Sequence, residues 1–122
     1  MRALTLTLAL TGCGWSVFGP DVVFVNRRPM DPVPPVYAGM YAEVERCLGA
    51  RGDFGAVRWL VADSVMIDGV WYAGVLEFPD NVTMWSRTVA LPWAVRHEMA
   101  HHITQIGDAL HDEYGRVPCE AT

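Results

Sequence analysis

The sequence predicts a small α+β domain, in which a mixed or antiparallel sheet of about three strands packs on two helices. Two segments, 37–48 and 92–106, carry apolar residues at helical spacing and are bounded by proline and glycine. Short runs rich in Val and Trp lie between them, separated by turn residues. A chain of 122 residues suffices for one domain with one core. We assign that domain to residues 34–122.

The first predicted helix covers residues 37–48. Its apolar positions recur at the i, i+3, i+4 and i+7 spacing of one helix face: Tyr37, Met40, Tyr41, Val44, Cys47 and Leu48. Pro34 and Pro35 suit its start, because the first turn of a helix needs no backbone N–H donors. Gly49 suits its end, since glycine readily adopts the left-handed conformation of a helix cap.

Three segments are predicted to form strands. Residues 56–62 and 69–78 are rich in β-branched and aromatic side chains. The pair at 68–69, Asp-Gly, is typical of a tight turn before the second of them. The Pro-Asp-Asn sequence at 79–81 breaks the chain, and residues 82–86 can form the third strand.

The second predicted helix runs from Pro92 to about Ile106. Thr88 is a candidate cap, and Pro92 falls in the first turn, where proline is tolerated. Gly107 is the predicted stop. An apolar stripe for core packing is formed by Val95, Met99, Ile103 and Ile106.

The N-terminus resembles a bacterial lipoprotein signal peptide. Arg2 precedes the apolar run ALTLTLAL at residues 3–10, which is shorter than the roughly 20 residues that span a bilayer. The sequence LTGC that ends at Cys13 resembles a lipobox. This resemblance implies removal of residues 1–12, lipid on Cys13, and a place at the periplasmic or extracellular face of the cell envelope. The Thr-Leu alternation is also compatible with a first β-strand.

Residues 13–33 are predicted to be a tether from the lipid anchor to the domain. They are rich in proline and glycine and contain one short strand-like run at 22–25.

The charge pattern excludes one class of partner. The nine basic residues are all arginine and never form a run, and the net charge is −5. Nucleic acid binding depends on clustered positive charge, so we expect no nucleic acid partner. The expected partners are a peptide or protein substrate and, through Cys13, the membrane; we expect a monomer.

Once Cys13 carries the lipid, Cys47 and Cys119 remain as an even pair. In an oxidising compartment such a pair favours a disulfide. Two buried free thiols are the alternative.

Residues 97–101 read HEMAH, which matches the pattern H-E-x-x-H. On a helix, His97 and His101 lie one turn apart on one face and can bind the same Zn²⁺. Glu98 is displaced around the helix, where it can act as the general base on a zinc-bound water without binding the metal.

A catalytic zinc site needs three protein ligands and an open position. His111 is the best candidate for the third, because the chain can turn back toward the metal after Gly107. Asp108 and Glu113 remain alternatives. His102 is expected to point away, since it lies 100° around the helix from His101.

The segment HEMAHHITQIGDALHDEYG resembles the active-site segment of zincin metallopeptidases of the gluzincin-like and SprT-like branch. The resemblance covers about 20 of the 122 residues. It implies a minimal zincin-like domain with zinc held by His97, His101 and His111, and Glu98 as the catalytic base. It also implies that a strand before the helix, at 82–86, lies along the cleft and pairs with an extended substrate. SprT-like proteins carry basic DNA-binding regions, which this chain lacks.

A group that stabilises the transition state is also needed. Tyr114, His102 and Arg96 are the candidates, and Tyr114 also follows from the resemblance. The alternative for Tyr114 is packing under the zinc loop.

The sequence thus predicts a lipid-anchored zinc metallopeptidase that hydrolyses peptide bonds at the bacterial cell envelope. The alternative is a non-catalytic envelope lipoprotein whose structural or vestigial metal site accompanies a partner-binding surface. The small size favours the alternative, whereas the intact Glu98 favours the enzyme.

Overall fold

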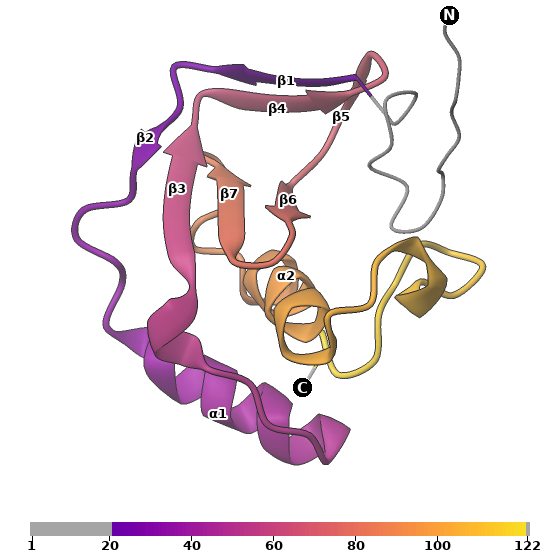
Figure 1. Cartoon of the computed structure of the whole chain (residues 1–122). Coiled ribbons are helices and arrows are strands. Elements are labelled where there is room, and N and C mark those ends of the chain that lie inside the picture. The colour runs from indigo at the N-terminus through magenta and orange to yellow at the C-terminus, as the bar shows by residue number, and fades with distance from the viewer. Residues whose placement is uncertain (1–20, 122) are drawn as a thin grey trace, which may run out of the picture.

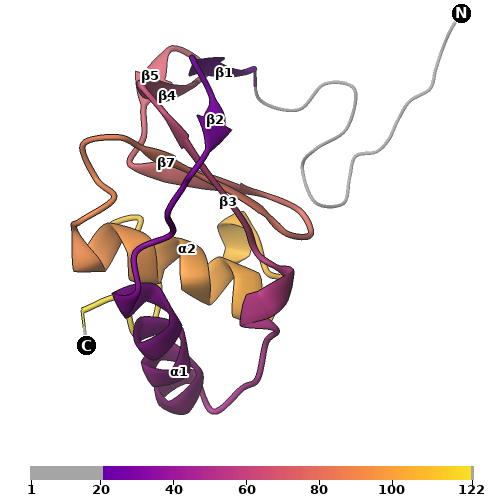
Figure 2. The ribbon, with the colours of Figure 1, turned by 90° about the vertical axis from the view of Figure 1, so that its left-hand side faces the viewer.

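Two β-sheets and two helices are stacked along one direction (Figures 1 and 2). The structure, a computed structural model, describes residues 21–121. A three-stranded sheet crosses one end of a four-stranded sheet, α2 lies below the larger sheet, and α1 lies beyond α2. The predicted α+β class is confirmed.

The larger sheet is mixed and has the strand order β2-β3-β7-β6. Its strands are β2 (Arg28–Pro29), β3 (Arg58–Ala62), β7 (Asn81–Trp85) and β6 (Gly74–Glu77). The central strands β3 and β7 are parallel, with Leu60 opposite Thr83. Both outer strands are antiparallel to their neighbours, and β6 forms the edge nearest α2.

The smaller sheet has the order β1-β4-β5 and is entirely antiparallel. It consists of β1 (Val22–Val25), β4 (Ser64–Ile67) and β5 (Val70–Trp71). The chain passes from β3 into β4 at Asp63, whose N–H donates to the carbonyl oxygen of Val25 at 2.8 Å. β4 was not predicted from the sequence.

The predicted strand 69–78 is divided between the two sheets. The N–H of Tyr72 donates to Val65 in the smaller sheet, whereas the carbonyl of Ala73 accepts from Trp85 in the larger one. The expected strand 56–62 begins two residues late, after a 3₁₀ turn at Phe54–Ala56.

The tether predicted at 13–33 overlaps the folded unit, because residues 22–25 and 28–29 belong to the sheets. The short strand expected at 22–25 is present as β1 and pairs with β4 along its whole length. Arg28 and Pro29 pair with β3. Both pairings place residues 21–33 inside the folded unit. The predicted signal peptide and Cys13 lie outside the described residues.

Within residues 21–121, no helix combines the length and apolar character that a membrane crossing requires.

Helix α1 (Val36–Leu48) matches the prediction closely. Pro35 is its N-cap, and Gly49 ends it in the left-handed conformation, with φ of 67°. The buried face carries Tyr37, Tyr41 and Val44. These three side chains belong to the main core together with residues of α2 and the larger sheet.

Helix α2 (Pro92–Thr104) begins as predicted but differs at both caps. Pro92 occupies the first turn, but Thr88 does not cap the helix. The Thr88 hydroxyl instead bonds to the carbonyl oxygens of Ala73 and Trp85 at 2.6 and 2.8 Å, which ties the preceding turn to the sheet. The helix ends two residues before the predicted Ile106, because Gln105 adopts the left-handed conformation, with φ of 55°.

The core lies where α2 meets the larger sheet on one side and α1 on the other. Val95, Met99 and Ile103 from the predicted apolar stripe are buried there. Ile106 is 43% exposed, because it lies beyond the end of the helix.

The predicted disulfide between Cys47 and Cys119 is present, with a Cα–Cα distance of 6.0 Å. It joins the last turn of α1 to the C-terminal segment, in which the described residues after the 3₁₀ turn at Asp108–Leu110, up to 121, form no regular helix or strand.

Candidate metal centre

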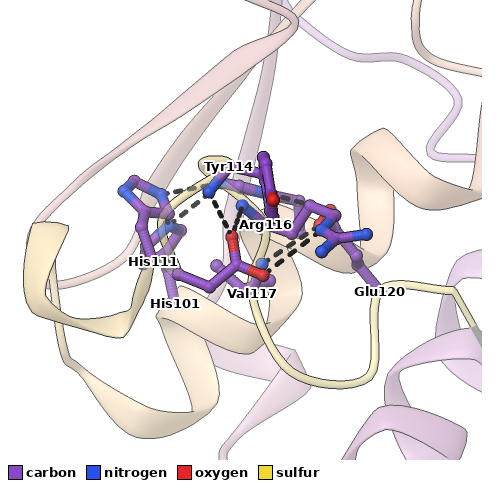
Figure 3. A network of polar contacts seen from close by, with 8 residues as sticks. His101, His111, Tyr114, Arg116, Val117 and Glu120 are labelled. Atoms are coloured by element: carbon purple, nitrogen blue, oxygen red, sulfur yellow. Dashed lines mark hydrogen bonds and ion pairs between the residues drawn. The ribbon is translucent and has the colours of Figure 1, made fainter.

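Three histidine rings converge beside the C-terminal half of α2, and Figure 3 labels two of them, His101 and His111. His97 and His101 lie one turn apart on the helix, and His111 follows the 3₁₀ turn at Asp108–Leu110. Their Nε2 atoms form a nearly equilateral triangle. The separations are 3.2 Å between His97 and His101, 3.1 Å between His97 and His111, and 3.0 Å between His101 and His111. The three histidines are therefore close enough to bind one metal ion.

The other nitrogen of each ring has an acceptor of its own. His101 Nδ1 lies 2.8 Å from the carbonyl oxygen of Ile106, which can only accept a hydrogen bond. His97 Nδ1 lies 3.0 Å from a carboxylate oxygen of Glu120, and His111 Nδ1 lies 3.1 Å from one of Asp108. In a neutral ring that donates from Nδ1, the Nε2 atom carries a lone pair and no proton.

Three Nε2 lone pairs thus point at one another. No hydrogen bond can form between these nitrogens, because none of them carries a proton. A cation between them removes this conflict. Zinc bound to imidazole nitrogens at about 2.0–2.1 Å in a tetrahedron places those nitrogens roughly 3.3 Å apart, close to the spacing found here. The geometry and the protonation state both fit a metal ion.

The pKa values of His97 and His101 favour the neutral form of both rings. Burial is the main cause that lowers the pKa of His101 to about 4 and also lowers the pKa of His97. Both rings are therefore unprotonated at neutral pH, as metal binding requires.

The structure brings His111 to the cluster, and neither alternative third ligand belongs to it. Asp108 bonds to the far side of the His111 ring, where it orients that ring. Glu113 lies on the exposed part of the following loop.

His102 points away from the cluster, as predicted. Its buried ring lies 2.8 Å from the Tyr41 hydroxyl through Nδ1 and 2.8 Å from Asp80 through Nε2. Arg96 forms an ion pair with Glu43 of α1 at 2.9 Å. Neither residue lines the cleft beside the histidines, so neither can serve as the predicted transition-state stabiliser.

The early end of α2 positions a hydrogen-bond acceptor for His101. The left-handed conformation of Gln105 turns the chain back, so that the Ile106 carbonyl reaches the ring of His101. The Gln105 side chain holds this turn by donating to the carbonyl oxygens of Pro79 and His102 at 2.9 and 2.8 Å. A sequence rule that expects glycine at a helix end cannot detect a cap of this kind.

The three histidines line a cleft of about 880 Å³. This volume is typical of sites for small molecules or short peptide segments. Glu98 also lines the cleft but is only 5% exposed. Burial, aided by the nearby charge of Glu120, raises the pKa of Glu98 to about 8 in the metal-free protein.

The rim of the cleft is unusually aromatic. Trp71, Tyr72, Trp93 and Tyr114 line it and are 44–73% exposed. Tyr114 is the most exposed of them, and the Arg116 guanidinium lies over its ring at 5.0 Å. Tyr114 therefore does not pack under the histidine loop, and Arg116 lines the cleft although it was not among the residues predicted for the site.

The predicted role of the strand at 82–86 is wrong. This strand is β7, and it is paired on both sides, with β3 and with β6. The edge strand beside the cleft is β6, and its residues Gly74, Val75 and Leu76 line the cleft.

Glu120 is the main residue of the site that the sequence analysis missed. It is 8% exposed, and its carboxylate accepts from both the His97 ring and the N–H of Val117, the latter at 3.1 Å (Figure 3). The only available signal was its position next to Cys119, which the predicted disulfide ties to the first helix.

Comparisons of the chain with models of known families, with curated proteins and with solved structures found no match.

Proposed function

We propose that this protein is a zinc-dependent peptidase of minimal zincin-like architecture. The observation that carries the proposal is the position of Glu98. This carboxyl group is buried, lies next to a metal ligand in the sequence and faces the same cleft as the three histidines. A purely structural metal site usually has four protein ligands, and it needs no free acid.

The three histidines would hold the ion through Nε2. A bound Zn²⁺ supplies Lewis acidity, which polarises a carbonyl group and acidifies a water molecule. Glu98 accepts the proton of the attacking water and then donates it to the leaving amine. The burial that raises the pKa of Glu98 keeps this carboxyl close to the range in which it can do both.

The edge strand β6 gives the substrate a place to bind. An extended peptide can add to this free edge through main-chain hydrogen bonds and so pass over the histidines. The aromatic rim favours large apolar side chains on that peptide. Tyr114 is the residue that we propose as the transition-state stabiliser, because it is the only one of the three sequence candidates on the cleft.

We further propose that the enzyme acts at the bacterial cell envelope, anchored by lipid on Cys13. The lipobox-like sequence LTGC supports this place, and the disulfide is consistent with an oxidising compartment. The substrate is then a peptide or protein of the envelope.

Replacing Glu98 with glutamine separates chemistry from metal binding. Glutamine has the same shape but cannot accept a proton, so Glu98→Gln should bind zinc normally and lose at least about 100-fold in hydrolysis rate. Cleavage of a mixed peptide library, followed by mass spectrometry, is the measurement. Glu113→Gln is the matched control, because it removes one exposed carboxylate outside the cluster.

Hydrolysis by Glu98→Gln at the wild-type rate would refute the mechanism. Zinc binding by the wild type without cleavage of any peptide in the library would favour the non-catalytic lipoprotein instead.

A further inference from the structure

We propose that Glu120 is the positioning residue for the metal ligand His97, and that the disulfide between Cys47 and Cys119 holds Glu120 in place. The disulfide is then part of the metal site, and its reduction weakens metal binding. This inference rests on the proposed metal centre.

His97 differs from the other two ligands in the origin of its partner. His101 bonds to Ile106 and His111 bonds to Asp108, so both partners lie within five residues of the ring that they orient. The partner of His97 is 23 residues away along the chain. Local backbone geometry therefore orients two rings, whereas the third depends on a tertiary contact.

The Glu120 carboxylate is well suited to orient a ligand. One oxygen lies 3.0 Å from His97 Nδ1, and the other accepts from the N–H of Val117 at 3.1 Å. A buried carboxylate without partners is costly, but this one has two donors. It fixes the ring tautomer in which Nε2 faces the cluster and makes that nitrogen a stronger ligand.

Between residues 111 and 121, the described part of the segment that carries Glu120, there is no helix or strand to hold it. Val117 packs into the main core, and the bond from Cys119 to Cys47 ties the segment covalently to the last turn of α1. Cys119 also has a φ of 71°, in the left-handed region that side chains other than glycine rarely adopt. Such a conformation persists only where the surroundings impose it.

These contacts determine how the disulfide affects zinc binding. With the disulfide closed, Glu120 is fixed against His97 and the three Nε2 atoms are preorganised for zinc. With the disulfide open, the segment is tied only by non-covalent contacts, so binding zinc must also order Glu120. The metal affinity of the reduced protein is therefore lower.

A double-mutant cycle on zinc affinity tests the inference. The variants are Glu120→Gln, the disulfide-free pair Cys47→Ser with Cys119→Ser, and the combination of both changes. The dissociation constant is measured by competition with a chromophoric zinc chelator, at a temperature at which circular dichroism shows every variant folded. Glu113→Gln is again the matched control for the loss of one carboxylate.

In the protein with its disulfide, Glu120→Gln should weaken zinc binding by about 10–100-fold, with the control unchanged. In the disulfide-free background, the same substitution should have a much smaller effect. An unchanged affinity in Glu120→Gln would overturn the positioning role. An equal loss in both backgrounds would overturn the role of the disulfide.

A second measurement covers the case in which the disulfide-free variant does not fold. Zinc-loaded wild type is treated with a phosphine reductant, and zinc release is followed with a fluorescent indicator. Bound zinc keeps the protein folded during the reduction. Release should accelerate, because the segment that carries Glu120 loses its covalent tie to α1. Release at an unchanged rate would overturn the inference. A folded wild type that binds no zinc would refute the metal centre itself, and with it this inference; loss of peptidase activity alone would not.

Discussion

Replacing Glu98 with glutamine should make the metal-free protein more stable at alkaline pH. Burial raises the pKa of this carboxyl from 4.5 to about 8 in the folded protein, whereas the unfolded chain ionises it near the ordinary value. Between these two values the unfolded state has lost the proton and the folded state still holds it. Folding stability therefore falls as the pH rises through this window. At about 1.4 kcal/mol per pH unit, the accumulated penalty above pH 8 is on the order of 5 kcal/mol.

The comparison with Glu98→Gln isolates this effect, because glutamine stays neutral and the other groups are common to both proteins. The lowered pKa of His101 acts in the opposite direction below about pH 6.5, so the wild-type curve alone is less informative. Urea unfolding in the presence of a metal chelator, between about pH 5 and pH 9, gives both curves.

The stability advantage of Glu98→Gln should grow by several kcal/mol from the acidic to the alkaline end. Glu113→Gln should run parallel to wild type, because its carboxylate is exposed. Parallel curves for wild type and Glu98→Gln would refute the reasoning, since Glu98 would then ionise in the folded protein as freely as in the unfolded one. Zinc should reduce the wild-type penalty, because a nearby cation favours the ionised carboxylate.

Three further predictions concern other parts of the structure. Cys47→Ser should lower stability by about 4 kcal/mol in oxidising buffer and have little effect in reductant; an equal loss in both buffers would show that the disulfide is not the cause. Tyr41→Phe should lower the free energy of unfolding in urea by about 1–3 kcal/mol, because it leaves the buried His102 Nδ1 without its partner. Its zinc affinity should be unchanged, and weaker zinc binding would contradict the separation of the Tyr41–His102 pair from the three-histidine cluster. Tyr114→Phe should lower kcat by about 100-fold with little change in KM, and an unchanged kcat would remove this hydroxyl from the mechanism.

The helices of this fold could be predicted from the sequence because their signals are local. Helical spacing, prolines at the start and Gly49 at the end defined α1 to within one residue. The two ligands on α2 followed from the same periodicity, since four residues on a helix bring two side chains to one face. His111 followed from the need for a third ligand and from the turn after α2, and the structure places it in the cluster.

The strands were harder to predict from the sequence, because their pairing is decided by tertiary contacts. The run 69–78 reads as one strand, yet its backbone hydrogen bonds belong to two sheets. Whether a strand lies inside a sheet or at its edge is likewise invisible in its own residues, so the strand beside the cleft was assigned to β7 when it is β6. β4 was missed because no strand was predicted between residues 62 and 69, although the chain only bends at Asp63 before β4 begins at Ser64.

The residues that orient the ligands were the least predictable part of the site. Glu120 reaches His97 across 23 residues, from a segment that the disulfide ties to α1. The Ile106 carbonyl is a backbone group and leaves no trace in the sequence. Ligands are identified by residue type and spacing, whereas their orienting partners are identified by geometry alone.

The most direct test of the metal centre is the zinc content of the purified chain and of three histidine variants, measured by elemental analysis. The account predicts about one zinc per chain in the wild type and in His102→Gln, a control that alters the one histidine outside the cluster. His97→Ala and His111→Ala should lose the metal while remaining folded. A folded wild type without metal, or a His111→Ala variant that keeps its full zinc content, would contradict the three-histidine site.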